Sequence, residues 1–252
     1  FILDQWGVMH DGQAGYLNAI KCIEKLHYKK KKLTIISNSS RKKKETLLRL
    51  PALGFQPSYF HEVMTSGEMI WSSLKNRHNS ETKNLGQRCF HIYDENKNEG
   101  DGFIEGLEKY SFVKNIQDAD FILGCTPFSN KEVVDYIPLL NIAKKKNLLF
   151  VCANPDYDTI EKKSNKNTFC MGTIAELYKN IEGETFILGK PSIEIYNKTF
   201  EKLKNIKKSK ILAIGDSIFH DIRGAVNFGV DSLLITSTGI HNEFFDNKNP
   251  LW

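Results

Sequence analysis

Short runs of apolar residues recur along the chain, and most of them end at a polar residue or a glycine. Apolar residues at helical spacing lie between several of these runs, for example over 16–26 and 193–203. Continuous apolar strands that alternate with helices are typical of a parallel sheet covered on both faces. The pattern therefore predicts an α/β fold with a doubly wound, Rossmann-like parallel-sheet core. The runs are FIL (1–3), LTIIS (33–37), TFILG (185–189), ILAIG (211–215) and SLLIT (232–236).

A polar side chain stands at the carboxyl end of four of these predicted strands. Asp4 follows the first strand, Ser37 ends the second, and Lys190 and Asp216 each follow a strand-ending glycine. The carboxyl ends of parallel strands share one edge of the sheet, and ligands bind there in open α/β folds. We therefore expect these four residues, which are distant in sequence, to converge on one site.

The middle of the chain carries its own α/β pattern, which predicts an inserted α/β cap domain. An amphipathic helix is predicted over 131–146, between two strand candidates. This block lies between the polar ends of the second and third core strands. We therefore expect a core domain of 1–80 and 184–252, with a cap domain over 81–183. The cap strand candidates are CFHIY (89–93), DFILGC (120–125) and LLFVCAN (148–154).

Composition and charge exclude some classes of partner. Hydrophobic residues make up 40% and charged residues 26% of the 252 residues, as in an ordinary globular protein. The net charge of +5 comes from 35 basic residues, of which only five are Arg. Lysines cluster at 29–32, 42–44 and 144–146, with only Tyr28 and Arg41 directly beside them and without the repeated aromatic and Arg side chains that a nucleic-acid-binding surface uses. Solvated helix ends and turns explain the clusters better, so we expect no nucleic-acid partner.

The five cysteines are scattered, and three lie in apolar runs typical of buried strands. No two have the spacing of a metal site, so reduced structural thiols in a reducing compartment fit best. No apolar run approaches the length of a membrane span, so we expect no membrane partner. The chain begins inside an apparent strand and without an initiator Met. We therefore expect residues upstream, and we infer a cytoplasmic location from the thiols alone.

Candidate chemistry begins at FILDQWG (1–7), where Asp4 follows a buried strand and precedes a glycine turn. Such a carboxylate can attack phosphorus as a nucleophile when a metal screens the charge repulsion. An Asp at a strand end is also a common turn former or helix cap. Taken alone, Asp4 fits both interpretations.

The stretch ISNSS (36–40) provides a candidate phosphate site. Ser37 ends a strand, and Asn38 and Ser39 open a predicted helix. A hydroxyl group together with free amide donors at a helix start binds phosphate oxygens. Plain N-capping by Ser39 or Ser40 is the simpler interpretation, and both can hold at once.

Two further stretches supply charge. Lys190, in ILGKPS (187–192), stands between a glycine and a proline, where it can neutralise a phosphoryl oxygen together with the Asp4 carboxylate. Asp216 and Asp221, in ILAIGDSIFHDIRGA (211–225), can hold Mg²⁺, which prefers oxygen ligands. The alternative for Asp221 is a helix N-cap.

These four stretches, in this order, resemble the four motifs of the haloacid-dehalogenase-like hydrolase superfamily. The insertion between the second and third motifs resembles the class IIA branch, which includes p-nitrophenyl-, phosphoglycolate-, pyridoxal- and nucleotide-phosphatases. The likeness covers nearly the whole chain, and it includes VCANPD (151–156) and the run from 171 to 196.

The resemblance implies a phosphoric monoester hydrolase in which Asp4 attacks a small phosphorylated metabolite and becomes an aspartyl-phosphate. It further implies that Lys190 steadies the charge and that Ser37, Asn38 and Ser39 bind the phosphate. The implied ligands of Mg²⁺ are the carboxylates of Asp4 and Asp216 and the backbone carbonyl of Trp6, with Asp221 in support.

The resemblance also gives the cap a role. It implies that Asn154, Asp156 and the loop that continues to about Cys170 close over the site and bind the substrate. Within that loop, Lys162, Lys163 and Lys166 suit an anionic substrate or face water. Class IIA relatives often dimerise through the cap, so a homodimer of this kind is also an expectation.

One position departs from the family pattern. Hydrolytic members normally carry Asp two residues after the nucleophile, and this Asp protonates the leaving oxygen and then activates water. Trp6 occupies that position here, and its indole N–H is a donor without a basic site. Loss of a general acid/base lowers a rate by about 10²–10⁴-fold. The backbone carbonyl is unaffected, so metal binding is expected to persist. A subset of class IIA sequences resembles this chain in carrying Trp here.

Three interpretations of Trp6 stay open. The protein is a phosphatase that uses another group, with His10, Asp11 and a cap residue as candidates. Alternatively, it works only on substrates with good leaving groups. Otherwise, it is a catalytically weak or inactive protein that binds phosphometabolites and has a regulatory role. In each case Trp6 can also pack the turn against the cap.

Overall fold

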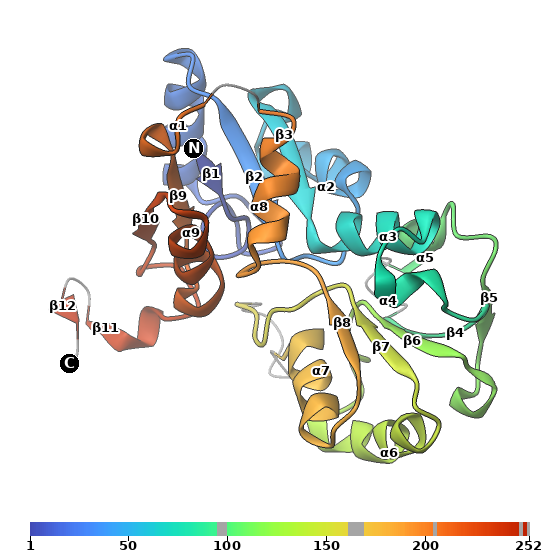
Figure 1. Ribbon diagram of the computed structural model, residues 1–252. Helices are drawn as coiled ribbons and strands as arrows, with labels where there is room; N and C mark the ends of the chain where they lie inside the picture. Colours follow the sequence, from blue (N-terminus) through green and yellow to red (C-terminus); the bar gives the residue numbers. More distant parts are fainter. Residues whose placement is uncertain (95–99, 161–168, 204–205, 247–248, 251–252) are drawn as a thin grey trace.

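The computed structural model describes residues 1–94, 100–160, 169–203, 206–246 and 249–250. In this part of the chain the main elements are two five-stranded sheets, and every recorded strand pair within them is parallel (Figure 1). Helices alternate with the strands and cover both sheets. The predicted α/β fold with a Rossmann-like core is therefore confirmed.

The first sheet carries the predicted strand ends at its carboxyl edge. Its strand order is β10-β9-β1-β2-β3, so the chain adds β2 and β3 on one side of β1 and later adds β9 and β10 on the other. The change of direction beside β1 is a topological switch point, where ligands bind in such sheets. The strands are β1 (Ile2–Leu3), β2 (Leu33–Ser37), β3 (Phe60–Thr65), β9 (Leu212–Gly215) and β10 (Asp231–Leu234).

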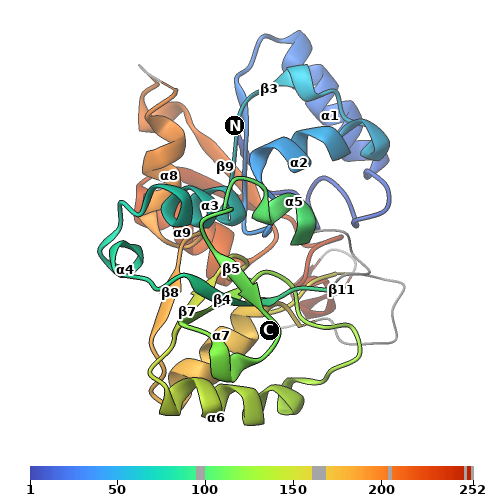
Figure 2. The same cartoon turned by 90° about the vertical axis from the view of Figure 1, so that its right-hand side faces the viewer.

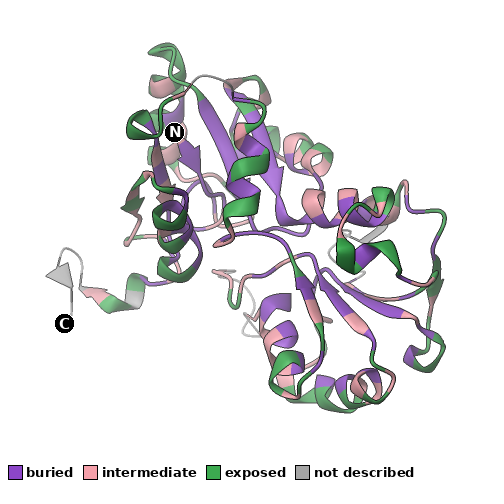
Figure 3. Ribbon diagram, viewed as in Figure 1, coloured by how far each residue is buried: buried purple, intermediate pink, exposed green. Residues whose placement is uncertain are grey.

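Helices cover both faces of this sheet, which explains its apolar strands. Ile35 and Ile36 are successive residues of β2, so their side chains point to opposite faces. Ile35 packs in the cluster that contains Ile23 of α1, whereas Ile36 packs with Ile195 of α8, and both β2 residues are fully buried. Figure 3 shows β2 and β3 largely buried. The helices are α1 (Leu17–Tyr28), α2 (Lys43–Arg49), α8 (Ile193–Phe200) and α9 (Arg223–Phe228).

The second sheet has the strand order β5-β4-β6-β7-β8. Helices α6 and α7 pack on one of its faces, and α3 and α5 pack on the other, at the junction between the two sheets (Figures 1 and 2). The strands are β4 (Arg88–Ile92), β5 (Ser111–Val113), β6 (Phe121–Gly124), β7 (Leu149–Cys152) and β8 (Thr185–Ile187). The helices are α3 (Ser66–Asn76), α4 (Ser80–Lys83), α5 (Gly100–Ile104), α6 (Ile137–Lys145) and α7 (Met171–Asn180).

One strand lies in a different sheet from the one expected. The apolar pattern predicted that residues 185–189 belong to the core, but β8 pairs in parallel with β7 of the second sheet. Phe186 and Leu188 are buried in the same cluster as Phe121 of β6, and this burial holds the segment there. The chain therefore returns to the first sheet after β8, immediately before Lys190. The predicted cap boundary at residue 183 is thus too early for the second sheet.

Other local predictions are confirmed with small shifts. The helix expected over 131–146 is a 3-10 turn, Val133–Tyr136, followed by α6. Strands β3 and β5 were not predicted, because FHEVMT mixes polar and apolar residues and SFV is only three residues long. A short antiparallel pair, β11 (Phe245–Asp246) and β12 (Asn249–Pro250), lies near the end of the chain. Within the described ranges, no helix combines the length and apolar character needed to cross a membrane.

Candidate active site

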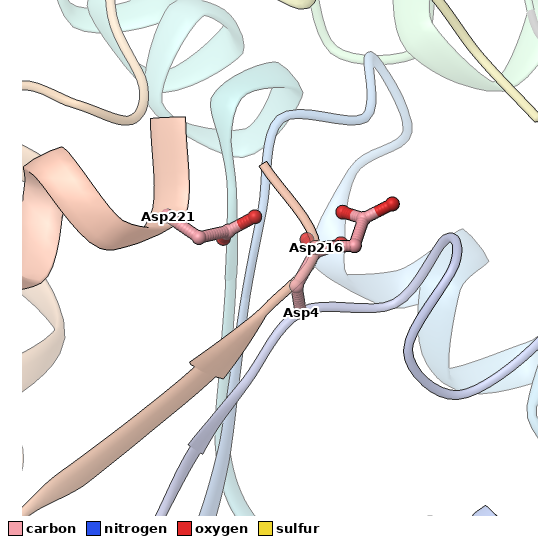
Figure 4. A group of neighbouring side chains, drawn as sticks. All are labelled: Asp4, Asp216 and Asp221. Atoms are coloured by element: carbon pink, nitrogen blue, oxygen red, sulfur yellow. The ribbon is translucent and has the colours of Figure 1, made fainter. Parts of the chain in front are cut away.

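Three buried carboxylates meet at the carboxyl edge of the first sheet. Asp4 follows β1, Asp216 follows β9, and Asp221 lies in the π-helical turn Ile218–Ile222 (Figure 4). One carboxylate oxygen from each residue can be chosen so that all three lie within 4.8 Å of one another. The two strands are hydrogen-bonded neighbours, with Leu3 opposite Ile214. Their register therefore brings Asp4 and Asp216 together, as the sequence predicted.

Two glycines make room for these acids. A Cβ atom on Gly215 would lie 2.1 Å from the side chain of Asp221, which no real contact permits. Gly7 has φ +75°, and a Cβ there would lie 2.1 Å from Oδ2 of Asp216. Side chains rarely adopt that backbone conformation, so glycine suits this turn for both reasons.

Lys190 lies in the segment that follows β8, and its side chain reaches the acids. Its side chain is 3% exposed, and Nζ donates to Oδ1 of Asp4 at 2.5 Å and to Oδ1 of Asp221 at 2.7 Å. Its backbone N–H donates to Oδ1 of Asn38 at 2.7 Å, which ties the segment to the end of β2. Lys190 is therefore fixed between the two carboxylates.

Burial and mutual repulsion shape the charge of the cluster. Burial, with a contribution from Asp221, raises the pKa of Asp216 to about 7. Burial also raises the pKa of Asp4 well above its usual range, against the opposing effect of Lys190. Burial alone would lower the pKa of Lys190, but Asp221 and Asp4 raise it well above its ordinary value, so the amine stays charged. When all three carboxylates are ionised, they and the ammonium carry a net charge of −2, and a divalent cation that neutralises this charge would favour the ionised forms.

The hydrogen bonds show which carboxylate oxygens of the three acids are free to bind a cation. Asp221 accepts from Lys190 at Oδ1 and from the backbone N–H of Ser217 at Oδ2. Asp216 accepts from the N–H of Ile240 at Oδ2, and Asp4 accepts from Lys190 at Oδ1. In the described part of the chain, Oδ2 of Asp4 and Oδ1 of Asp216 are thus left without a recorded hydrogen bond. This donor set fits a hard cation such as Mg²⁺.

A cavity of about 200 Å³ opens above these residues. The core contributes Asp4, Trp6 and Lys190 to its lining, and the segment after β7 contributes Asn154, Asp156 and Tyr157. The site therefore lies between the two sheets, and Asn154 and Asp156 of the stretch VCANPD reach it. The predicted loop lysines Lys162, Lys163 and Lys166 lie outside the described residues.

The predicted phosphate segment divides into two parts. Ser39 lines the cavity together with Ser40 and Arg41. Ser37 and Asn38 are about 1% exposed and are absent from the described lining. The Asn38 side chain donates to Oδ1 of Asp156 at 2.8 Å, so it links the end of β2 to the segment after β7.

Two simple capping interpretations are wrong. Helix α2 begins at Lys43 and has no side-chain cap hydrogen bond at its N-cap, so neither Ser39 nor Ser40 caps it. Asp221 lies inside the π-helical turn, whose N-cap is Ser217. In both cases the chain forms an additional loop or turn before the regular helix, and residue patterns do not reveal it.

His10 and Asp11, two of the candidate substitutes for the missing acid/base, are absent from the described lining of the cavity. His10 is buried, and this burial lowers its pKa to about 3, so the ring is neutral. Asp11 accepts backbone hydrogen bonds from Gln13 and Ala14, which lower its pKa and occupy it in the turn. Neither residue is placed to act on a substrate in this cavity.

Several lining residues were missed in the sequence analysis. His220 lines the cavity, and its Nδ1 lies 3.1 Å from Oγ of Ser217 and 3.5 Å from Oδ1 of Asp156. Its position directly before Asp221 was the only available signal. Thr126, Phe169 and Phe219 also line the cavity, but they come from segments whose spacing marks no motif.

Comparisons with known proteins agree with this architecture. A family model described as haloacid dehalogenase-like hydrolase matches residues 1–100, and a second, described as HAD-hydrolase-like, matches residues 187–246. Together the two models include the carboxyl ends of β1 and β9 and all three acids of the site. The fold is an α/β core with an inserted second sheet, and its acidic site lies at the carboxyl edge of the core sheet. The chain belongs to the haloacid dehalogenase-like hydrolase superfamily.

Solved structures show the same fold over nearly the full chain. A haloacid dehalogenase-like hydrolase from Brucella suis 1330 is 28% identical, with a TM-score of 0.82, and the match covers 95% of this chain and 89% of that one. A possible sugar phosphatase from Cytophaga hutchinsonii has 18% identity, a TM-score of 0.73 and coverage of 96% and 86%. A p-nitrophenyl phosphatase from Archaeoglobus fulgidus has 18% identity, a TM-score of 0.67 and coverage of 98% and 89%. No match was found among curated protein sequences.

Proposed function

We propose that this protein is a Mg²⁺-dependent phosphatase of small phosphorylated metabolites that acts through an aspartyl-phosphate on Asp4. The observation that carries this proposal is the buried cluster of Asp4, Asp216 and Asp221 with Lys190 bonded between two of them. The phosphatases among the similar structures support the same class of reaction.

The first half-reaction uses Asp4 as the nucleophile. Its carboxylate oxygen forms a bond to phosphorus while the bond between phosphorus and the ester oxygen breaks. The departing oxygen takes a proton from water, since the indole of Trp6 has no proton acid enough to give. Lys190, 2.5 Å from Asp4, neutralises negative charge on the nucleophile and the phosphoryl group.

The second half-reaction restores the carboxylate. Water attacks the phosphorus of the aspartyl-phosphate, the bond between phosphorus and Asp4 breaks, and orthophosphate leaves. The proton that the attacking water loses passes to solvent, where it neutralises the hydroxide left by the first half-reaction. With all three carboxylates ionised, the cluster of residues has a charge of −2, which fits Mg²⁺. Asp4, Asp216 and the carbonyl of Trp6 would hold the cation, with Asp221 in support. When bound, the cation screens the repulsion between nucleophile and phosphate.

Trp6 supports one alternative, a catalytically weak or inactive protein that binds phosphometabolites and has a regulatory role. Positioning and charge stabilisation carry most of phosphoryl transfer, so the lost acid/base slows turnover without removing ligand binding. Esters whose leaving group is the anion of an acidic alcohol or phenol need little protonation of the departing oxygen. Turnover of such esters should be least affected by the loss of the acid/base.

One experiment separates these functions. Turnover of p-nitrophenyl phosphate and of a panel of alkyl phosphomonoesters is measured with Mg²⁺, beside the isosteric variant Asp4→Asn. Turnover of both types that vanishes in Asp4→Asn supports the phosphatase, and turnover of the nitrophenyl ester alone supports a restriction to good leaving groups. Ligand protection against thermal unfolding without Asp4-dependent turnover supports the binding protein.

The inserted second sheet is proposed to act as a class IIA cap. Its residues Asn154 and Asp156 line the cavity, and Asp156 is bonded to Asn38 of the core, which supports a role in closing the site and in binding substrate. A homodimer through the cap and a cytoplasmic location are parts of the same proposal. Sedimentation of the purified protein tests the dimer.

A further inference from the structure

The side chain of Trp6 is fixed on one side by the turn that follows it. A Cβ atom on Gly12 would lie 2.2 Å from Cζ3 of the indole, so the six-membered ring rests directly on the glycine backbone. The imidazole of His10 meets the indole edge-on, with ring centroids 5.2 Å apart. Two neighbours from one loop therefore hold the indole in a single position.

Hydrogen bonds make this loop a firm support. Gly12 donates its N–H to Nδ1 of His10 at 3.0 Å, and the carbonyl of Gly12 accepts from Arg49 of α2 at 3.0 Å. The N–H of Gly7 donates to the carbonyl of His10 at 3.0 Å. The loop that carries Trp6 is thus tied to itself and to a helix, and Trp6 loses little freedom when a ligand binds.

Trp6 is half-buried and also lines the cavity that holds Asp4. Tyr157, Phe169 and Phe219 line the same cavity, so much of the wall beyond the acids is aromatic. A phosphoryl group bound at Asp4 would place the organic part of the ester beside this wall. A preorganised aromatic surface favours a flat ring, because offset-stacked and edge-to-face ring pairs are stabilised beyond the area that they bury.

We propose that Trp6 is a specificity-determining residue that stacks against the organic group, and that the favoured substrates are phosphomonoesters carrying an aromatic or heteroaromatic ring. This inference rests on the proposed function, since it needs the phosphoryl group at Asp4. It gives the residue that replaces the usual acid/base a binding role. Aromatic pairing contributes about 2- to 12-fold in affinity beyond burial.

Binding is measured without turnover in the Asp4→Asn protein with Mg²⁺. Trp71→Phe and Trp252→Phe leave Trp6 as the only fluorescent indole, and phenyl phosphate, ethyl phosphate and orthophosphate are titrated in turn. We expect phenyl phosphate to bind about threefold to tenfold more tightly than ethyl phosphate and to change the emission of Trp6. Equal affinities and equal emission changes for the two esters would overturn the inference.

Substitutions test both Trp6 and the Gly12 loop that holds its indole. Trp6→Leu should bring the ratio of phenyl to ethyl affinity close to one, and Trp6→Phe should restore most of it. Gly12→Ala should also lower the ratio, because its methyl group displaces the indole, while orthophosphate affinity stays the same. Trp71→Leu removes a tryptophan outside the described lining and should leave the ratio unchanged. An unchanged ratio in both Trp6→Leu and Gly12→Ala would refute the proposal.

Failure of the proposed function has a different signature. If neither ester nor orthophosphate binds in the presence of Mg²⁺, the phosphate site itself is wrong and the inference falls with it. If orthophosphate and both esters bind equally well, the phosphate site stands and only the role of Trp6 is refuted. Circular dichroism of each variant verifies that the fold is retained.

Discussion

Replacing Lys190 with Met gives the sharpest test of the charged cluster. Lys190 is 3% exposed and bonds to Asp4 and Asp221 at 2.5 and 2.7 Å. Methionine has a similar length and no charge, so the substitution removes the ammonium with little change in packing. The two carboxylates would then lie buried beside Asp216 without their counter-charge.

The expected loss of stability is large. Removing one partner of a buried ion pair lowers the free energy of unfolding by about 3–5 kcal/mol. For a chain of this size each kcal/mol shifts Tm by about 2–4 °C, so the melting temperature should fall by roughly 6–20 °C. Without Lys190 the carboxylate pKa values of Asp4 and Asp216 rise further, and the folded state then binds more protons than the unfolded one. The destabilisation should therefore be greater at pH 8 than at pH 5.

Thermal unfolding followed by circular dichroism in EDTA, at both pH values, measures this effect. Lys198→Met is the matched control, because its ion pair with Glu201 is mostly exposed, with side chains 54% and 62% accessible. Surface pairs contribute about 0–1 kcal/mol, so the control should melt within a few degrees of the parent. If Lys190→Met melts within about 2 °C of the parent at pH 8, the electrostatic reasoning is refuted.

Three further outcomes are expected. Saturating Mg²⁺, at about 100 times its Kd, should raise the free energy of unfolding by about 2.7 kcal/mol, and Asp216→Asn should abolish the rise measured in thermal melts; an equal rise in the variant would contradict the metal site. Gly215→Ala should lower stability by about 1–3 kcal/mol and weaken the Mg²⁺ effect, because its methyl group meets Asp221 at 2.1 Å; urea titrations matching the parent would contradict the packing. Burial lowers the pKa of His91 to about 3, so the unfolded state binds one more proton between about pH 6.5 and 3, and stability is lost as pH falls through that window. His91→Phe should reduce the slope of unfolding free energy against pH by about 1.4 kcal/mol per unit, and an unaltered slope in urea titrations from pH 4 to 6 would exclude this role.

Local patterns were sufficient to predict the acidic centre. In a parallel sheet the carboxyl ends of neighbouring strands share an edge, so residues that follow β1 and β9 must lie close if those strands pair. Asp4 and Asp216 follow directly from this rule. Lys190 was also predicted at the site, although the strand before it lies in the other sheet. The backbone hydrogen bond to Asn38, 152 residues away, places Lys190 in the cluster.

The α/β class, the strand ends and the acids could be predicted from the amino-acid sequence, because strand patterns and glycine turns depend on a few neighbouring residues. The sheet to which β8 belongs could not be predicted, because an apolar run is buried equally well in either sheet, and long-range packing selects one of them. Long-range packing also places Asp221 within a π-helical turn and Trp6 on Gly12 beside His10. Such contacts depend on the conformation of loops. That conformation depends on the packing of distant segments as well as on the local residue types.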